Sequence, residues 1–368
     1  MTTHATRITS AARSVTVTSS TASVTDWALD YFGPWWNACA TSSPYSGPVV
    51  SADIAPAETA GIARQLADYD HHEALYASSP MLYAADGPTV SAYQAADELA
   101  YCSEPGHLRI TGHDALPVAL AAARLARELL RAKLMGDGWK ILHASAAVKD
   151  GQTVLTLGDK GAGKTTTALL LARSGWQLLA NDRVFVRTGN DGVDVVPWPS
   201  AAAVGLGLLD ALGLYDGVRE RVLAGQTLHP TQAQAVTDAL TEGQRLPLWN
   251  DSGKELKPQF APSQLVTWLG LTLATEGRAA RLVFPRVTPG ATPATDAQGR
   301  TLTGGDFFNA ATEDRYPDVF GLTPPEADTS RVQREVLTQA LNGLPRHSIT
   351  LGHDVKANAE FLAELADQ

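Results

Sequence analysis

The sequence predicts an α/β fold preceded by a smaller α+β region, and three observations lead to this class. The chain has 368 residues, of which 44% are hydrophobic and 18% charged, enough for a large core and about two domains. A glycine loop at 158–163 joins an apolar, β-branched run to an Ala/Leu-rich run, in the order strand, loop and helix. Beyond this loop, further strand patterns are interspersed with helical ones.

The chain divides into three parts. Residues 1–24 are rich in Ser, Thr and Ala and lack the apolar centre of a secretion signal, so we expect a disordered polar tail. Residues 25–110 carry many aromatic and turn residues, and we expect an N-terminal α+β region with short strands and one or two short helices. Residues 111–368 form the larger domain that contains the glycine loop.

The elements around the loop follow from their patterns. Apolar residues recur at helical spacing over 116–135 and predict a helix. A strand over 139–148 and a turn at 149–152 lead into a second strand over 153–157, which makes a hairpin that ends at the loop. The helix after the loop is expected over 165–174, with Gly175 at its C-terminal cap.

The chain after this helix is mostly helical with a few strands. A strand over 176–180 ends at Asn181 and Asp182, and the runs 184–187 and 193–196 predict a hairpin. Asp354 is a candidate cap of the last helix, and the Pro/Gly/Thr-rich residues 288–305 are expected to form a mobile loop. The remaining expected elements are helices over 201–215, 231–242, 263–276, 330–342 and 356–365 and strands over 281–287 and 348–351.

Residues 158–165 match the phosphate-binding loop (P-loop, Walker A) pattern G-x-x-x-x-G-K-[ST] at each fixed position. The glycines let backbone N–H groups turn inward, and the helix N-terminus adds partial positive charge, so the segment can cradle phosphates. Lys164 can reach the β- and γ-phosphates of ATP or GTP, and the Thr165 hydroxyl can bind Mg²⁺. The residues expected to bind the nucleotide are Gly158, Asp159, Lys160, Gly161, Ala162, Gly163, Lys164, Thr165 and Thr166.

A carboxylate at the end of a neighbouring strand usually completes the metal site of such loops. Asp182 follows an apolar run at the end of the next expected strand. The expected Mg²⁺ ligands are therefore Thr165 and Asp182, and the alternative for Asp182 is an ordinary loop aspartate.

Three spaced motifs resemble the catalytic core of HPr kinase/phosphorylase: residues 142–146 (LHASA), 157–166 and 175–182 (GWQLLAND). The likeness is strongest to HPr-kinase-like kinases of natural-product clusters, including the lasso-peptide kinases, and covers about residues 139–187. It implies a fold like that of HPr kinase and phosphoenolpyruvate carboxykinase, in which a mixed sheet carries the loop. Because HPr kinases assemble, the resemblance also makes a homo-oligomer an expectation.

The resemblance assigns roles to residues beside the loop. In that family a histidine before the loop strand lies near the γ-phosphate, and His143 matches it; the alternative is a hydrogen-bonded scaffold residue. Two consecutive aspartates follow the next strand, the second binding metal, which matches Asp182. The first acts as the base, and this chain has Asn181 there, an amide that can orient a hydroxyl but cannot accept its proton near pH 7. This departure weakens any phosphorylase activity and leaves the base unassigned, although a loose phosphoryl-transfer transition state needs little base assistance.

Three further groups are weaker candidates. Arg286 ends an expected strand and can clamp phosphate or take part in a surface ion pair. Lys254 and Lys257 can receive an anionic substrate or lie in a solvated loop. The charged run 313–315 is a candidate substrate contact or base, against a simpler capping or salt-bridge role.

Composition limits the partners. A net charge of −10 and a pI near 5.4 argue against a broad nucleic-acid or anionic-membrane surface, and no apolar run reaches membrane-spanning length. Cys39 and Cys102 lie far apart and match no metal spacing, which is typical of reduced thiols in a cytoplasmic protein. The expected partner is a small-molecule or peptide acceptor, with no nucleic acid and no membrane.

The main functional hypothesis is a Mg²⁺- and ATP- or GTP-dependent kinase. It would phosphorylate a hydroxyl of a nucleoside, sugar or similar natural-product intermediate, or of a peptide, with Lys164, His143, Asn181, Asp182 and Arg286 at the reaction centre. A second hypothesis, favoured by Asn181, is a regulatory nucleotide-binding module that hydrolyses slowly or not at all. A third, a carboxykinase acting on an oxaloacetate-like acid, is disfavoured because the sequence has no transition-metal cluster for enolate chemistry.

Overall fold

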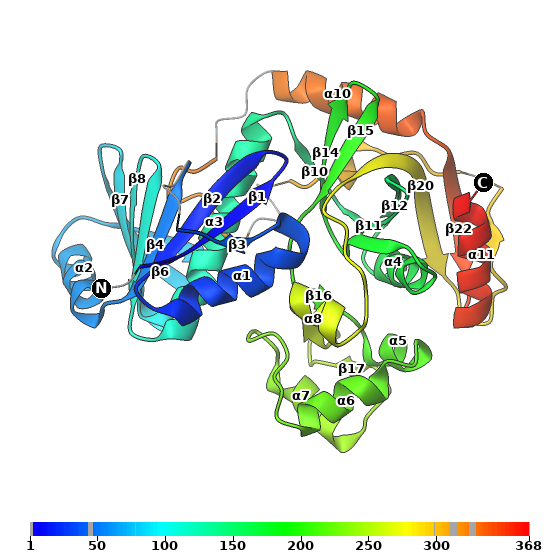
Figure 1. The fold of residues 1–368 in the computed structure, drawn as a ribbon, viewed down its shortest axis with the longest axis horizontal. Coiled ribbons are helices and arrows are strands. Elements are labelled where there is room, and N and C mark those ends of the chain that lie inside the picture. Colours follow the sequence, from blue (N-terminus) through cyan, green and yellow to red (C-terminus); the bar gives the residue numbers. More distant parts are fainter. Residues whose placement is uncertain are drawn as a thin grey trace. The chain divides into compact units, whose positions relative to one another are not determined.

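A computed structural model of the chain describes residues 3–42, 47–77, 79–297, 299–309, 315–323 and 329–367. The chain divides into two compact units, both visible in Figure 1. The first combines Met1–Trp139 with Phe308–Ser330, and the second combines Lys140–Phe307 with Arg331–Gln368. Each unit is built from a large mixed sheet and several helices, so the predicted α/β class is confirmed.

The first unit is a mixed sheet with helices on both faces. Its strands lie in the order β3-β1-β2-β4-β9-β8-β7-β6-β5, in which β2, β4 and β9 are parallel neighbours. Helices α1 and α3 pack on one face, and α2 packs on the other. The elements of this unit are β1 (His4–Ser10), β2 (Arg13–Ser19), α1 (Ala22–Trp36), β3 (Cys39–Ala40), β4 (Val49–Ile54), α2 (Pro56–Asp68), β5 (His72–Tyr76), β6 (Ser79–Asp86), β7 (Thr89–Gln94), η1 (Ala95–Asp97), β8 (Leu99–Glu104), β9 (His107–Gly112) and α3 (Ala115–Gly136).

The expected disordered tail over 1–24 is wrong, because β1 and β2 form a hairpin and α1 follows directly. The two strands pair antiparallel from His4↔Ser19 to Ser10↔Arg13. Ile8, Val15 and Val17 alternate with polar residues and are buried. A Ser/Thr-rich composition is typical of a tail, but threonine and valine also favour strands, and valine alternates with threonine over 15–18 as in a strand.

The predicted helix over 116–135 is confirmed as α3, but the expected domain boundary at residue 111 is wrong, since α3 belongs to the first unit. Its apolar stripe is buried against β2, β4 and β9. Arg124 on this helix donates to the hydroxyl of Tyr101 at 3.0 Å and lies over the rings of Tyr76 and Tyr316, at 4.8 and 5.1 Å. Because Tyr316 comes from the second segment of the unit, this cluster joins the two segments.

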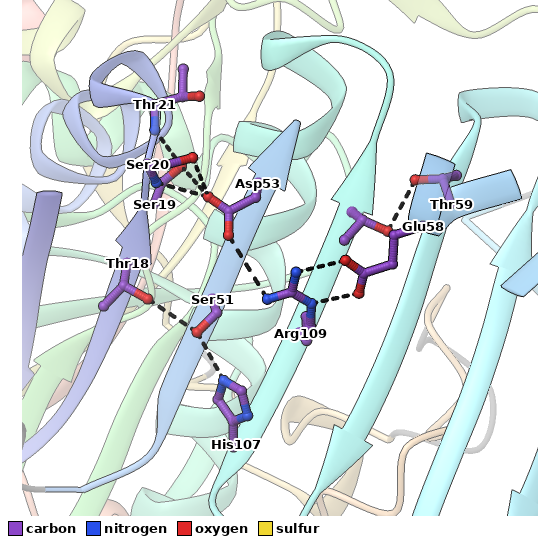
Figure 2. A network of polar contacts seen from close by, with 11 residues as sticks. Thr18, Ser19, Ser20, Thr21, Ser51, Asp53, Glu58, Thr59, His107 and Arg109 are labelled. Carbon is purple, nitrogen blue, oxygen red and sulfur yellow. Dashed lines mark hydrogen bonds and ion pairs between the residues drawn. The ribbon is translucent and has the colours of Figure 1, made fainter. Parts of the chain in front are cut away.

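A polar network crosses the face of the first sheet that carries α2 (Figure 2). Arg109 of β9 donates to both carboxylate oxygens of Glu58 in α2, at 2.6 and 2.7 Å. Beside it, Ser51 of β4 lies 2.8 Å from Nε2 of His107 and accepts a hydrogen bond from Thr18 at 3.1 Å. The charge-assisted pair ties α2 to the sheet, and the hydroxyl chain links β2, β4 and β9.

The second unit is built on another mixed sheet, in the order β10-β14-β15-β20-β12-β11-β13, with β22 beside β20 and β21 beside β22. Strands β12, β20 and β22 run parallel, and α4 packs on β11 and β13. Its elements are β10 (Lys140–Leu142), β11 (Ala144–Lys149), β12 (Gln152–Leu157), α4 (Lys164–Arg173), β13 (Gln177–Ala180), β14 (Val184–Gly189), β15 (Gly192–Pro197), β16 (Ala202–Ala203), α5 (Leu206–Ala211), α6 (Tyr215–Leu223), α7 (Gln234–Glu242), β17 (Leu248–Trp249), β18 (Glu255–Leu256), β19 (Gln259–Phe260), α8 (Pro262–Thr267), β20 (Gly277–Val287), β21 (Ala294–Thr295), η2 (Gly304–Asp306), α10 (Thr329–Asn342), β22 (Arg346–Leu351) and α11 (Val355–Asp367).

The sequence predicted helix ends in this unit correctly where a single capping residue determines them. Gly175 follows α4 with φ 91°, and the Asp354 carboxylate accepts the N–H of Ala357 in the first turn of α11 at 3.0 Å, so both predicted caps are confirmed. The helices expected over 201–215 and 263–276 are wrong in extent, since α5 and α8 are short. Gly213 and Gly270, with φ of 68° and 66°, lie just beyond them, and a left-handed residue cannot continue an α-helix. Strand β21 and η2 lie within or at the end of the loop expected over 288–305.

A buried arginine and a histidine meet between β20 and β22. Nη1 of Arg281 lies 2.7 Å from Nε2 of His347. Because a guanidinium can only donate, Nε2 must accept, and the imidazole in this contact is neutral. Burial and the charge of Arg281 both lower the pKa of His347 below its ordinary value of 6.5.

We predict that His347 makes the fold acid-sensitive. A histidine whose pKa is lowered by folding contributes stability that is fully present above the unfolded value of 6.5 and is lost as the pH falls through the folded-state pKa. His347→Gln keeps an acceptor for Arg281 but cannot titrate, so its free energy of unfolding should fall less between pH 7.5 and pH 5. The check is urea unfolding across that range, with exposed His353→Gln as the control. Equal slopes for wild type and His347→Gln would contradict this account.

Candidate functional site

Strand pairing brings three separate segments to one edge of the second sheet. β11 is antiparallel to both of its neighbours, so β12 and β13 run in the same direction on either side of it. Ala144 pairs with Leu157, and Ala146 pairs with Ala180. His143, the loop after β12 and the residues after β13 therefore lie at the same edge, where parallel strands end and ligands are commonly bound.

The loop between β12 and α4 has the predicted strand–loop–helix context. Gly158, Gly161 and Gly163 have φ of 150°, 87° and 108°, positive values that residues with a side chain rarely adopt. The N–H of Ala162 donates to the carbonyl of Asp159 at 3.1 Å and tightens the turn. Helix α4 begins at Lys164 without a side-chain cap on its first turn. Its first N–H groups are thus available to an anion.

The side chain of Lys164 turns back over this loop. Its ammonium donates to the carbonyl oxygens of Gly158 at 2.6 Å and Asp159 at 3.1 Å. Burial lowers the pKa of Lys164, whereas the carboxylates of Asp182 and Asp159 raise it. A partly buried cation whose charge is disfavoured by burial gains from a nearby anion, so this position suits a phosphate.

The first turn of α4 is attached to the neighbouring strands. The buried Ser145 of β11 donates its hydroxyl to the carbonyl of Lys164 at 2.7 Å. Thr165 Oγ1 lies 3.5 Å from the carbonyl oxygen of Asn181, a long contact that nevertheless places its hydroxyl beside the end of β13. Ser145 lies in the LHASA motif at 142–146, but its residue type and position alone predicted no role for it.

Asn181 and Asp182 differ in exposure. Asn181 is only 8% exposed, and its side-chain oxygen accepts the Ser200 hydroxyl at 3.4 Å. The side chain of Asp182 is 53% exposed, with Arg183 Nε 3.4 Å from its carboxylate. The carboxylate is therefore accessible from solvent, and the amide is largely enclosed.

The strand expected over 139–148 is wrong at its centre, since it breaks at His143 into β10 and β11. The N–H of His143 donates to the carbonyl of Asp306 at 2.8 Å, outside the ladder between neighbouring strands. The adjacent Leu142 forms an isolated bridge with Phe307. A segment far along the chain thus takes over the pairing at this point and sets the backbone position of His143.

The weaker candidates are placed differently. Arg286 is 70% exposed, donates to Thr350 Oγ1 at 3.2 Å and lies 3.8 Å from the Asp296 carboxylate. Lys257 forms an ion pair with Glu255 at 2.9 Å, and Lys254 is exposed on the preceding turn. Glu313 and Asp314 of the run 313–315 lie outside the described residues.

Two charged residues that the sequence analysis did not select lie near Lys164. The carboxylate of Asp306 is 5% exposed and accepts from Arg300 Nη2 at 2.7 Å. The charge of Arg300 lowers the pKa of Lys164 and that of Asp306 raises it, after the larger effects of burial, Asp182 and Asp159. Neither residue belongs to a local motif, so only the fold reveals them.

No protein-family model matches the chain, and no curated protein gives a significant sequence match. Among solved structures, the chain is similar to the Hpr(Ser) kinase/phosphatase from Coxiella burnetii, with 14% sequence identity and a TM-score of 0.22. The match covers 41% of this chain and 61% of that one, so the chain spans less than two thirds of its neighbour. This is a weak structural neighbour, and it does not define a family for the chain.

Two kinds of feature are absent from the described residues. None of the helices described here combines the length and apolar character that crossing a membrane takes. In the same residues, no group of three or more His, Cys, Asp or Glu side chains is placed to hold a metal ion.

We predict that Gly163→Ala destabilises the second unit more than Gly151→Ala does. A Cβ at residue 163 would lie 2.7 Å from Val287 Cγ2, in addition to the strain of φ 108°. The expected loss of unfolding free energy is about 3 kcal/mol. Gly151→Ala, with φ 77° and no atom within 4 Å of its Cβ, isolates the strain alone. Val287→Ala should recover part of the Gly163→Ala loss in urea unfolding, and no recovery would refute the predicted overlap.

Proposed function

We propose that the chain is a kinase that uses ATP or GTP with Mg²⁺ to phosphorylate a hydroxyl group of a small metabolite or a peptide. The observation that carries the proposal is the convergence, at one sheet edge, of a complete glycine loop with Lys164, the exposed carboxylate of Asp182 and His143.

The loop fits the phosphates of a nucleotide. Its glycines hold positive φ, and an added Cβ at Gly161 would meet no atom within 4 Å, so space remains on that side of the turn. Backbone N–H groups over 158–166 would donate to the phosphate oxygens, and Lys164 would supply the positive charge. In this proposal Lys164 moves from the carbonyls of Gly158 and Asp159 to the more strongly attracting phosphate oxygens.

Thr165 and Asp182 would hold Mg²⁺. Thr165 reaches the end of β13 through its contact with the Asn181 carbonyl, and the Asp182 charge acts on Lys164. A hydroxyl and a carboxylate are both oxygen ligands, which Mg²⁺ prefers. When bound, Mg²⁺ neutralises charge on the phosphates during transfer.

The acceptor hydroxyl would be oriented by His143 and Asn181. His143 lies at the same sheet edge as the loop. There an imidazole nitrogen can accept a hydrogen bond from the hydroxyl of the substrate. Asn181 retains its amide N–H groups as donors, while its oxygen already accepts from Ser200. Neither role calls for a strong base, because the transition state of phosphoryl transfer is loose. The role expected for Arg286 is less well supported, because its guanidinium contacts Asp296 and Thr350.

One observation favours the second candidate, a nucleotide-binding regulatory module. Asn181 occupies the position at which HPr kinase/phosphorylase, the family that the motifs resemble, has its base. The side chain of Asn181 is largely enclosed. A module of this kind would bind nucleotide without transferring phosphate. Cytoplasmic location, self-association and the absence of nucleic-acid and membrane partners stay predictions.

We predict that Lys164→Ala abolishes nucleotide binding and phosphate transfer in a folded protein. The test incubates wild type and variant with MgATP or MgGTP and a panel of nucleosides, sugars and peptides, and records phosphate gain by mass spectrometry. Lys149→Ala, at the opposite end of β11, is the matched control and should behave as wild type. Transfer by wild type supports the kinase, whereas binding without transfer to any acceptor supports the regulatory module. Unchanged nucleotide affinity in Lys164→Ala would remove the loop assignment.

We predict that Asp182→Asn lowers kcat by about a hundredfold or more, the scale of a lost electrostatic contact. Nucleotide affinity without Mg²⁺ should change by less than about threefold, since the loop carries ground-state binding. Steady-state kinetics at varied Mg²⁺ and nucleotide titrations in EDTA separate the two effects. Asp191→Asn, in the turn between β14 and β15, is the control. A wild-type rate at limiting Mg²⁺ for Asp182→Asn would show that another group holds the metal.

A further inference from the structure

We propose that Arg300 is a catalytic residue whose guanidinium contacts the transferred γ-phosphoryl group, and that Asp306 is the positioning residue that holds it. The inference rests on the proposed kinase function. In the step concerned, the acceptor oxygen bonds to the γ-phosphorus as the bond to the β–γ bridging oxygen breaks. The nucleoside diphosphate leaves with that oxygen, and the acceptor proton passes to solvent.

Arg300 is held on three sides. Its backbone N–H donates to Ser348 Oγ on β22 at 2.8 Å, and its guanidinium carbon lies 5.0 Å from the centre of the Phe284 ring. Nη2 donates to the buried Asp306 carboxylate at 2.7 Å. Asp306 in turn accepts from the N–H and the hydroxyl of Thr303, at 2.8 and 3.2 Å. An arginine fixed in this way loses little further freedom when it binds an anion.

The supports of Arg300 border the loop. Phe284 lies on β20, which pairs in parallel with β12 up to Thr156↔Val283, so Phe284 stands abreast of Leu157, the last residue of β12. The carbonyl of Asp306 accepts a hydrogen bond from the N–H of His143. His143 directly precedes Ala144, which pairs with Leu157. Asp306 is thus hydrogen-bonded to a residue of the edge where the loop begins, and Phe284 stands beside that edge.

The charges around Lys164 agree with this placement. The charge of Arg300 reaches Lys164 strongly enough to add to the effect of burial in lowering its pKa. Two cations that repel each other are stabilised by an anion that both can contact. The Arg300 side chain is 38% exposed, and Asp306 takes only one of its nitrogens, so other guanidinium N–H groups can reach a phosphate. In related chemistry an arginine on the transferred group supplies a large part of the rate.

The test separates binding of the diphosphate from binding at the γ-position. Wild type and variants are titrated with MgADP alone and with MgADP plus aluminium fluoride, which mimics the planar transferred group. For Arg300→Gln we expect MgADP affinity within about threefold of wild type and a loss of about a hundredfold in the additional affinity brought by aluminium fluoride. Arg278→Gln, at the other end of β20 and paired with Asp191, is the matched control and should behave as wild type.

Two further variants keep the test decisive. Arg300→Lys preserves the charge and the pairing with Asp306 but not the two-nitrogen geometry, so it should show only part of the additional affinity brought by aluminium fluoride. If Arg300→Gln fails to fold, Arg300→Lys serves as the test. The full additional affinity in Arg300→Lys would then overturn the proposal. Asp306→Asn alone should reduce the additional affinity brought by aluminium fluoride. In the Arg300→Gln background the same substitution should cause no further reduction, and a purely structural role of Asp306 would not produce this coupling.

The outcomes distinguish this inference from the proposed function. If wild type binds MgADP, Lys164→Ala does not, and Arg300→Gln keeps the full gain with aluminium fluoride, then the nucleotide site stands and the role of Arg300 is refuted. If Arg286→Gln loses the gain instead, Arg286 is the phosphate contact. If wild type binds no nucleotide, the proposed function fails and this inference fails with it.

Discussion

The register of β11 between β12 and β13 is the constraint on which the candidate site depends. Because β11 is antiparallel to both neighbours, the ends of β12 and β13 share an edge with its first residue. A slip of one residue would turn the side chains of β11 to the opposite faces. Ala144, Ser145 and Ala146 are fully buried, so close packing on both faces opposes such a slip. Ser145 then transmits the register to α4 through the Lys164 carbonyl.

The electrostatic arrangement of the site follows from what contacts Lys164. Its ammonium is held by two backbone carbonyls, whose dipoles stabilise the charge without cancelling it. A directly bonded carboxylate would cancel most of that charge and compete with an incoming anion. The carboxylates of Asp182 and Asp306 act through space, each held by another group, Arg183 and Arg300 respectively. The charge of Lys164 is therefore available to a phosphate in the proposed kinase.

The sequence predicted those features that a short segment determines alone. The loop at 158–165, the caps at Gly175 and Asp354 and the placement of Asp182 after a strand depend on neighbours in the chain, and the fold class follows from them. The break at His143 depends on the distant carbonyl of Asp306, which no local pattern encodes. An amphipathic stripe likewise shows that α3 packs on a sheet, but not on which of two sheets.

The first unit is made of two separated segments, with the whole second unit between them in the chain. During synthesis, the aromatic cluster of Tyr76, Tyr101 and Arg124 leaves the ribosome long before Tyr316, which completes it. Part of the aromatic surface of the N-terminal sheet therefore stays uncovered while the residues of the glycine loop are translated. A gene cut between residues 139 and 140 would encode a first unit without its last piece, so the two units cannot be exchanged as simple consecutive modules.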